Sequence, residues 1–274
     1  MSTTDALRTA LAGEGDSRTL RLDRAFQGLP DTAHGGSVLA AFDAAAGRVG
    51  PRTLRGHYLK RVPVGTPLAL RVAGGVRFTL LDGDAVLVSG AVEDAAGGET
   101  PLAEPPPADA PLLPISRGCF ACGTDNALGL GARLRADDHV VGGVWAARPG
   151  FRRDDGTLAP VALTTLLDEA AFWLGALATG ESGMTTELRV MLHADVKGDE
   201  TIVVAGSRET VRARADDARY WDTRIVARDA GGRVVASAAI TFVAVRGAAR
   251  RLAAGMLAVN DAEVIRRVFP AYVR

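Results

Sequence analysis

The pattern of apolar and polar positions repeats once along the chain. Each half contains an apolar run with helical spacing, followed by strand-like segments that turns separate. These segments lie at 36–47, 53–74 and 85–93 in the first half and at 159–177, 186–206 and 233–245 in the second. Turn sequences precede the last segment of each half, at 82–84 and 230–232. The pattern predicts one helix and several antiparallel strands in each half, an α+β arrangement.

The order of matching residues indicates an internal duplication. Asp43 aligns with Asp168 at an offset of 125, and Leu54 with Leu188 at an offset of 134. Ser89 aligns with Ser237 at an offset of 148, so the offset grows along the chain. Longer loops in the second copy explain this growth. We therefore expect two copies of one unit, in which a curved sheet wraps around a long helix.

Finer patterns predict a half-buried strand and a terminal helix. In 188–195, Leu188, Val190 and Leu192 would face one side, and Arg189, Met191 and His193 the other. Near the end of the chain, Asn260 as N-cap and Glu263 three residues later predict a short helix that serves packing.

A proline-rich stretch divides the two halves. Six of the thirteen prolines lie in 101–114, a density that excludes both a helix and a central strand. We interpret 1–98 as the first unit, 99–114 as a linker, 115–246 as the second unit and 247–274 as a tail.

Charge and composition exclude several functional classes. The 32 basic and 32 acidic side chains balance, so no overall field favours nucleic acid or an anionic membrane. No segment approaches 18 uncharged apolar residues, and residues 1–16 do not have the pattern of a signal peptide. We therefore expect a cytoplasmic protein that binds neither nucleic acid nor a membrane.

The two cysteines, Cys119 and Cys122, form a single Cys-x-x-Cys pair. They make no disulfide framework, which is consistent with a reducing compartment. No second pair follows, and His139 and His193 lack the spacing of zinc ligands. We interpret the cysteines as structural thiols and expect neither a metal nor a cofactor.

The segment from His34 to Gly47 has the pattern H-G-G-x6-D-x3-G. Glycines at a helix start let a ligand approach the backbone amides closely, and Asp43 follows His34 by nine positions. At about 1.5 Å of rise per residue, the acid lies roughly 13 Å from that start. The two features therefore cannot act on the same atom.

This segment resembles the central-helix motif of hotdog-fold thioesterases. Residues 51–66 are similar to the first long strand of those families, and the duplication resembles the double-hotdog acyl-CoA thioesterases, including the type II enzymes. Residues 119–131 also resemble a segment of actinobacterial double-hotdog proteins. This resemblance covers roughly residues 20–246. It implies a tandem hotdog fold that hydrolyses acyl-CoA thioesters, with a homodimer of double hotdogs expected by analogy alone.

In that family each site lies between units, where one helix supplies N-terminal amides and the other a carboxylate. By this resemblance, site one joins Asp168 to the amides of Gly35 and Gly36. Site two joins Asp43 to the second helix start, where Pro160 has no N–H to donate. We therefore expect site one to work and site two to be degenerate.

The resemblance also assigns further roles within site one. His34 is expected to orient the carbonyl, and Thr185 matches the hydroxyl residue that holds the water in type II enzymes. Ile240 stands where those enzymes carry glutamine, which points to an acid-plus-amide mechanism like that of the phenylacetate-pathway thioesterases. Glu169 is the alternative working acid, and His34 could equally be a turn residue without a chemical role. A threonine in the place of Thr185 is more often an ordinary strand hydroxyl than a catalytic one.

Three basic residues, Arg55, Lys60 and Arg61, are candidates for binding the phosphates of coenzyme A, together with the neighbouring Arg52. Two competing functions stay open. A non-catalytic acyl-CoA or small-ligand binder is favoured by Pro160 and Ile240. A hotdog enoyl-CoA hydratase would need an Asp and a His held together over the acyl chain, and its Asp-x-Asn-Pro-x-His motif is absent.

Overall fold

A computed structural model describes residues 1–95 and 103–273 of the chain. The helices are α1 (Thr3–Ala10), α2 (Gly35–Ala46), α3 (Pro160–Thr179), α4 (Ala248–Met256) and α5 (Ala262–Val268), with short 3-10 turns η1 (Arg24–Phe26), η2 (Pro149–Phe151) and η3 (Arg208–Thr210). The first-half strands are β1 (Leu11–Ala12), β2 (Ser17–Leu20), β3 (Arg52–Tyr58), β4 (Leu68–Ala73), β5 (Arg77–Asp82) and β6 (Ala85–Asp94). The second-half strands are β7 (Arg135–Ala136), β8 (Val140–Ala146), β9 (Gly183–Leu192), β10 (Thr201–Ser207), β11 (Arg212–Ala213), β12 (Tyr220–Arg228) and β13 (Val234–Ala244).

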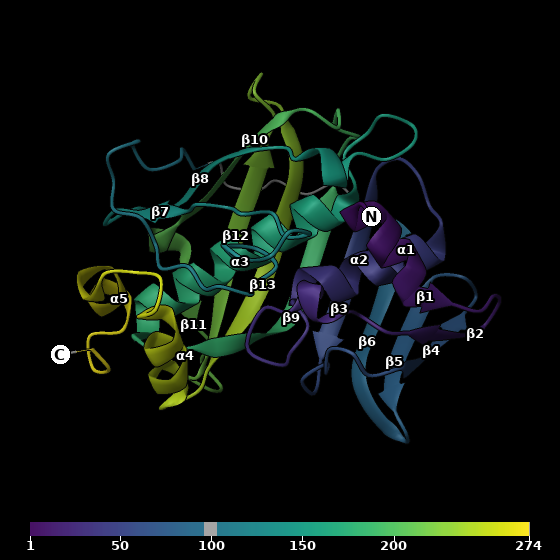
Figure 1. Cartoon of the computed structure of the whole chain (residues 1–274), viewed down its shortest axis with the longest axis horizontal. Coiled ribbons are helices and arrows are strands. Elements are labelled where there is room, and N and C mark those ends of the chain that lie inside the picture. The colour runs from purple at the N-terminus through teal and green to yellow at the C-terminus, as the bar shows by residue number, and fades with distance from the viewer. Residues whose placement is uncertain (96–102, 274) are drawn as a thin grey trace.

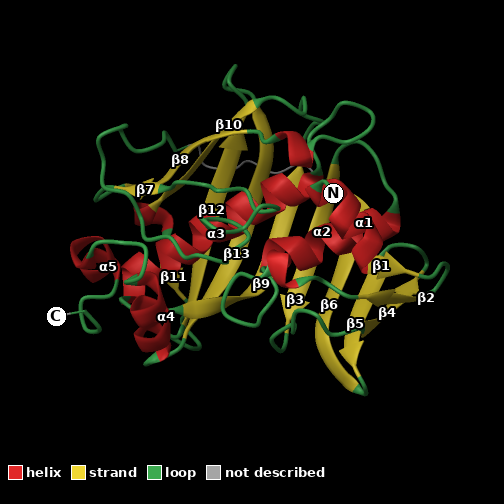
Figure 2. Cartoon of the chain, in the orientation of Figure 1, coloured by secondary structure: helices red, strands yellow, loops and turns green. Residues whose placement is uncertain are grey.

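All the strands belong to one antiparallel sheet. Its order is β1-β2-β4-β5-β6-β3-β9-β13-β12-β10-β8-β7, with β11 paired to β12. The two halves of the chain therefore meet at the β3–β9 pair, where Leu54 lies opposite Val190. The helices α2 and α3 lie side by side across one face of this sheet (Figures 1 and 2). The α+β arrangement predicted from the sequence is confirmed.

Matching backbone hydrogen bonds support the predicted duplication. The residue that caps each central helix donates its N–H to the last residue of the preceding 3-10 turn. The residue before that cap donates to the loop that follows the first strand after its helix, which is β3 in the first half and β9 in the second. These bonds are His34 N to Phe26 O (2.8 Å), Ala159 N to Phe151 O (2.7 Å), Ala33 N to Val62 O (2.8 Å) and Leu158 N to Val196 O (2.8 Å).

Both central helices end on a glycine in the left-handed conformation. Gly47 has a φ of 63° and Gly180 a φ of 67°, values that disfavour other residues. The longer helix, α3, is also apolar enough to cross a membrane by length and composition, which the sequence argument did not anticipate. However, 83% of that window is buried inside the fold, and the helix carries Asp168 and Glu169. Its apolarity is therefore that of a core helix.

The predicted alternation along β9 holds only in part. Leu188, Val190 and Leu192 are buried and Arg189 is exposed, as expected. Met191, expected on the polar side, is also buried. The strand is central, and Met191 lies between Thr53 of β3 and Ser237 of β13, both of which are also buried.

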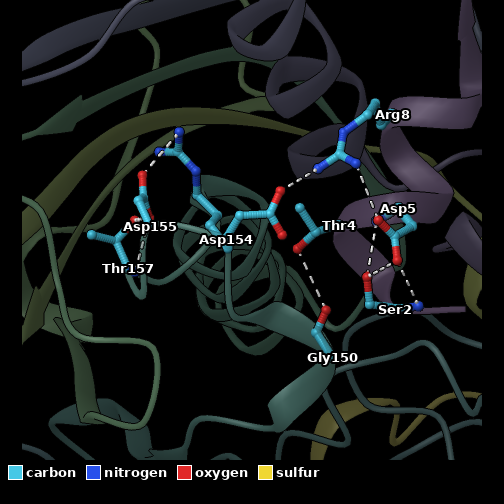
Figure 3. Close-up of polar contacts among 9 residues, drawn as sticks. Ser2, Thr4, Asp5, Arg8, Gly150, Asp154, Asp155 and Thr157 are labelled. Atoms are coloured by element: carbon cyan, nitrogen blue, oxygen red, sulfur yellow. Dashed lines mark hydrogen bonds and ion pairs between the residues drawn. The ribbon is translucent and has the colours of Figure 1, made fainter.

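The N-terminal helix α1 belongs to the first half by sequence but contacts a loop of the second. Thr4 Oγ1 donates to the carbonyl of Gly150 at 3.5 Å, and Arg8 pairs with Asp154 at 3.4 Å (Figure 3). Ser2 and Asp5 form a capping box that starts the helix. Exposed contacts of this kind contribute little energy individually, and the apolar face of α1 supplies most of the attachment.

The C-terminal tail differs from the prediction. The helix α5 begins after Asp261, not after Asn260, and no side chain caps it. The side chain of Asn260 is engaged by the backbone of Ile115, accepting from its N–H at 2.8 Å and donating to its carbonyl at 2.7 Å. A further helix, α4, was not predicted and packs Leu252 and Met256 against the core. The tail therefore attaches to the start of the second unit.

The proline-rich stretch lies partly outside the described residues. The predicted boundary at 98 and the first linker residues, 99–102, cannot be compared with the structure for that reason. In the described part, residues 103–114 form neither helix nor strand apart from an isolated bridge at Leu112. Arg228 holds this part in place by bonding to Glu104 at 2.7 Å and to the carbonyl of Ala103 at 2.6 Å.

A buried ion pair joins α2 to the first long strand. Asp43 accepts two hydrogen bonds from Arg52, from Nε at 2.5 Å and from a terminal nitrogen at 2.7 Å. Both residues are almost fully buried, and Arg52 also donates to the carbonyl of Gly50 at 2.6 Å. The pairing raises the pKa of Arg52 although burial opposes its charge. Arg52, suggested above as a phosphate ligand, is therefore unavailable to a substrate.

We expect Asp43→Ala to lower the free energy of unfolding by about 3–5 kcal/mol, because it leaves the Arg52 guanidinium buried without its partner. Urea denaturation followed by circular dichroism measures this. The double variant Asp43→Leu/Arg52→Met should lose less stability than the single variant. A double variant that is less stable than Asp43→Ala would contradict this account.

Candidate active site

A pocket lies between the two halves of the chain, beside the start of α2 and the middle of α3. The cavity itself has a volume of about 100 Å³ and opens to solvent, which suits the reacting end of a larger ligand. The walls come from the loops at 28–34 and 58–62, from residues 116–122, and from α3, β9 and α4. The apolar part of the wall consists of Leu29, Val62, Phe172, Trp173, Met184, Leu252 and Met256.

Asp168 is the carboxylate at the centre of this pocket. Its Oδ1 accepts a hydrogen bond from Thr185 Oγ1 at 2.5 Å. Its Oδ2 accepts from the Gly36 N–H at 3.0 Å and lies 3.1 Å from His34 Nδ1. The fold thus brings together four of the residues predicted for site one, from the two central helices and β9. The second helix supplies the acid and the first the amide.

His34 stands between two carboxylates. Its Nδ1 faces Asp168, and its Nε2 lies 3.5 Å from Glu169 Oε2. The Gly36 N–H also lies 3.3 Å from His34 Nδ1, but a protonated Nδ1 cannot accept this hydrogen. We assign that N–H to Asp168, the shorter contact. Both ring nitrogens are thus occupied, so His34 positions carboxylates and does not point at a substrate carbonyl, contrary to the sequence-based expectation.

These contacts shift the pKa values of both groups toward their charged forms. Burial opposes ionisation of Asp168, but hydrogen bonds from His34, Thr185 and Gly36 lower the pKa of its carboxyl below the usual value. Burial likewise opposes protonation of His34, but Asp168 and Glu169 raise its pKa well above 6.5. The pair is therefore a carboxylate and an imidazolium at neutral pH.

The two glycines at the start of α2 are required by close packing. A Cβ on Gly35 would lie 2.7 Å from Asp168 Oδ2, and one on Gly36 would lie 2.5 Å from the carbonyl oxygen of Thr164. Thr164 Oγ1 also donates to the carbonyl of Gly36 at 2.8 Å. No hydrogen bond within the described residues uses the Gly35 N–H, which belongs to the first turn of α2, at the positive end of its helix dipole.

Tyr58 and Trp173 are pocket residues that sequence reasoning missed. Tyr58 donates its hydroxyl to the carbonyl of Gly35 at 2.6 Å, and Trp173 Nε1 donates to Glu169 Oε1 at 3.0 Å. Burial and the nearby Asp168 charge raise the pKa of Tyr58 well above 10, so it stays a donor. The i, i+4 spacing of Glu169 and Trp173 on one helix was the available signal for the second contact.

The second predicted site does not form as expected. Asp43 does not line the pocket, and its carboxylate is bound by Arg52, not directed at a helix start. Pro160 begins α3, and the helix has no side-chain cap. A carboxylate neutralised by a buried guanidinium is a structural element. The expectation that Asp43 faces a degenerate second site is therefore wrong, because Asp43 forms an ion pair with Arg52 instead.

The three basic residues predicted to bind coenzyme A do not lie together. Lys60 and Arg61 line the pocket, and Arg61 Nε lies 3.4 Å from the sulfur of Met184. Arg55 is exposed in β3, where it pairs with Glu93 at 3.3 Å and lines a separate depression. Side chains alternate along a strand, so Arg55 points away from the helix-covered face that carries Leu54. The prediction for Arg55 is wrong in this respect.

Ile240 also lies away from the pocket. It is buried in β13, opposite Leu188 of β9, and does not line the wall around Asp168. Thr185, by contrast, is paired with Phe242 across the same strands. The residue at position 240 therefore does not touch the acid in this chain.

Three residues beside Asp168 have the chemistry of metal ligands. Cys119 and Cys122 bring their thiols close to the carboxylate of Glu169, and all three are buried in the pocket wall. From the sequence only the two cysteines are recognisable as ligands, because Glu169 is remote in the chain.

We expect the imidazole of His34 to remain protonated well above the pH at which a free histidine titrates. Asp168→Asn should lower its pKa, because the largest attractive contact is lost. Protonated His34 stabilises the folded protein at any pH below the pKa that it has in the unfolded chain. This contribution is lost as the pH rises through the higher pKa that His34 has in the folded protein. NMR titration of the ring nitrogens measures this.

His193 serves as the internal control for this titration. Burial lowers its pKa, so its signal should move at a pH below 6.5 in both the parent and the variant. A neutral His34 ring at pH 7 in the parent protein would contradict the assigned ion pair.

No family model and no curated protein matches the sequence. Many solved structures do match. A hot-dog-fold protein from Alicyclobacillus acidocaldarius superposes with a TM-score of 0.61 at 17% identity, over 89% of this chain and 97% of that one. The tesB protein from Mycobacterium avium subspecies paratuberculosis gives 0.62 at 12% identity, over 89% and 100%.

An acyl-CoA thioesterase II from Mycobacterium marinum gives a TM-score of 0.57 at 15% identity, over 90% of this chain and 99% of that one. A GphF dehydratase also matches, at 0.55, so the shared fold alone does not decide the reaction. These matches extend over both halves of the chain, as a fold made of two units in tandem requires. The chain has the double-hotdog fold, as its resemblance to the double-hotdog thioesterases implied.

Proposed function

We propose that this protein hydrolyses an acyl-CoA thioester to a free acid and coenzyme A at the Asp168 pocket. The observation that carries the proposal is the contact between the Asp168 carboxylate and the glycine-rich start of α2, 3.0 Å from the Gly36 amide. Thioester hydrolysis needs a carboxylate and a group that stabilises negative charge on the carbonyl oxygen. Acyl-CoA thioesterase II from Mycobacterium marinum shares the fold.

Asp168 is suited to hold and activate a water molecule. A carboxylate offers about four lone-pair positions, and three of these accept from Thr185, Gly36 and His34. The remaining position, on Oδ1, can accept a proton from water. The lowered pKa keeps the acid ionised at neutral pH. We therefore assign Asp168 the role of general base and Thr185 that of fixing its orientation.

The amides at the start of α2 are suited to the developing oxyanion. The Gly35 N–H makes no hydrogen bond within the described residues, and the absence of a side chain lets the start of α2 approach Asp168 closely. The positive end of the helix dipole adds to the attraction. Tyr58 fixes this turn by donating to the carbonyl of Gly35 at 2.6 Å.

Lys60 and Arg61 are the basic groups suited to the phosphates of coenzyme A, because both line the pocket that contains Asp168. The apolar wall suits an acyl or aryl group. The proposal therefore places the carrier near the 58–62 loop and the acyl group against Phe172 and Trp173.

A dehydratase or hydratase is the second candidate, since His34 and Asp168 are in contact and a dehydratase shares the fold. That reaction needs a histidine nitrogen directed at the acyl chain. Both nitrogens of His34 face carboxylates instead, which favours hydrolysis. A binder without activity is the third candidate, and substrate tests separate all three.

Asp168→Asn should reduce the rate of thiol release from acyl-CoA by roughly 10²–10⁴-fold, because the general base is lost. The measurement is a colorimetric thiol assay over short, long, branched and aromatic acyl-CoA substrates. Asp43→Asn is the control, because Asp43 lies outside the pocket. It should retain activity at temperatures where circular dichroism shows it folded.

The single-site model would be contradicted if the Asp168→Asn variant kept its thiol-release activity. It would also be contradicted if a folded Asp43→Asn variant lost as much activity as Asp168→Asn. Binding of acyl-CoA without thiol release from any substrate would favour the binder. Loss of the enoyl absorbance of 2-enoyl-CoA without thiol release would favour the hydratase.

A further inference from the structure

Cys119, Cys122 and Glu169 form a cluster that thioester hydrolysis does not use. One ligand atom from each, two sulfurs and a carboxylate oxygen, lie within 4.8 Å of one another. Exposed fractions of 5%, 5% and 6% show that all three are shielded from bulk water. The cysteines come from the loop that opens the second half, and the glutamate from the middle of α3. Such a set, brought together from distant segments, resembles a coordination sphere and not a chance surface cluster.

The loop that carries Cys119 and Cys122 is held in shape by its own backbone hydrogen bonds. The N–H of Ala121 donates to Cys119 Sγ at 3.3 Å, and the N–H of Gly123 donates to the carbonyl of Cys119 at 2.9 Å. A Cβ on Gly123 would lie 2.3 Å from that same carbonyl oxygen, so the tight turn requires glycine. An N–H bond to sulfur stabilises a thiolate, the form that binds metals.

The loop is also anchored on both sides. The N–H of Phe120 donates to the carbonyl of Gln27 at 2.7 Å, and the N–H of Ala132 donates to the carbonyl of Ala121 at 2.9 Å. Zinc–sulfur bonds of about 2.3 Å place tetrahedral sulfurs about 3.8 Å apart. The two sulfurs therefore need to approach by at most about 1 Å, and each sulfur and the carboxylate oxygen by slightly more, to reach that geometry.

Glu169 has the surroundings of a metal-binding carboxylate. Trp173 Nε1 donates to its Oε1 at 3.0 Å, and His34 Nε2 lies 3.5 Å from its Oε2. These contacts fix the carboxylate but leave lone pairs for a further partner. Outer-shell hydrogen bonds of this kind orient the ligands of a metal and are part of most such sites.

The cluster also accommodates the charge of a divalent cation. Two thiols that release their protons to bind a dication leave the net charge of the pocket wall unchanged.

We propose that Cys119, Cys122 and Glu169 bind a zinc ion in the wall of the pocket. Two thiolates select a thiophilic metal, and a carboxylate as third ligand is usual for zinc but not for copper(I) or iron–sulfur clusters. Three protein ligands leave a fourth position for water or for a ligand in the pocket. The ion would join the cysteine loop to α3, next to Asp168. This proposal does not depend on thioester hydrolysis.

The test uses the full-length protein, purified without an affinity tag, incubated with zinc chloride under reducing conditions and then desalted. Mass spectrometry of the metal content should find one zinc per chain. Replacement by cobalt(II) should produce a thiolate-to-cobalt charge-transfer band in the near ultraviolet, together with the visible bands of a tetrahedral ion. Cys119→Ser, Cys122→Ser and Glu169→Gln should each weaken zinc binding at least about tenfold.

Glu187→Gln is the matched control, because it also changes a glutamate but lies on β9 outside the cluster and pairs with Arg214. It should bind zinc like the parent. Thiol protection provides a readout that needs no variant: zinc should slow modification of both cysteines by iodoacetamide in the folded protein.

Zinc content equal in the parent and the folded Cys119→Ser variant would overturn the proposal. So would thiols whose modification rate zinc does not change. Spontaneous formation of a Cys119–Cys122 disulfide, seen as a loss of two hydrogens without any metal uptake, would assign the pair a redox role instead. None of these results depends on whether the protein hydrolyses acyl-CoA.

Discussion

The close approach of two helix backbones at Gly36 is the constraint on which the site depends. A side chain there would collide with Thr164, whose hydroxyl instead donates to the carbonyl of Gly36. This contact places the start of α2 against the second turn of α3, so that the Gly36 amide reaches Asp168 one turn further along α3. If a side chain at position 36 held the two helices further apart, Asp168 would lose its hydrogen bond from the Gly36 amide.

The two duplicated acids show how one fold position acquires two different uses. Asp43 is paired with a buried guanidinium from β3, which neutralises it and ties helix to sheet. Asp168 is held by Thr185 from β9 and by groups of the other helix, and it remains beside open space. A strand arginine therefore makes a structural element of the first acid, whereas a strand threonine leaves the second in the pocket. Whether such an acid stabilises the fold or is available for chemistry therefore depends on the residue that it contacts.

Much of the fold follows from patterns that are local in the sequence. Helical spacing locates the two central helices, and the strand-like patterns include β3, β6, β9 and β13. The tail was less predictable, because the side chain of Asn260 finds a tertiary partner in Ile115 and caps no helix. Local capping rules fail where a distant backbone competes for the same side chain.

The sequence alone determined the duplicated α+β plan, since the order of helices and strands is a linear property, and only the resemblance to hotdog thioesterases implied the pairing of Asp168 with the Gly35–Gly36 turn. Only the tertiary structure decided which neighbours each group has. It directed Arg55 away from Lys60 and Arg61, because residues of one strand alternate between faces. It also set Glu169 against Cys119 and Cys122 across about fifty residues of chain, a proximity that arises from packing and leaves no periodic trace in the sequence.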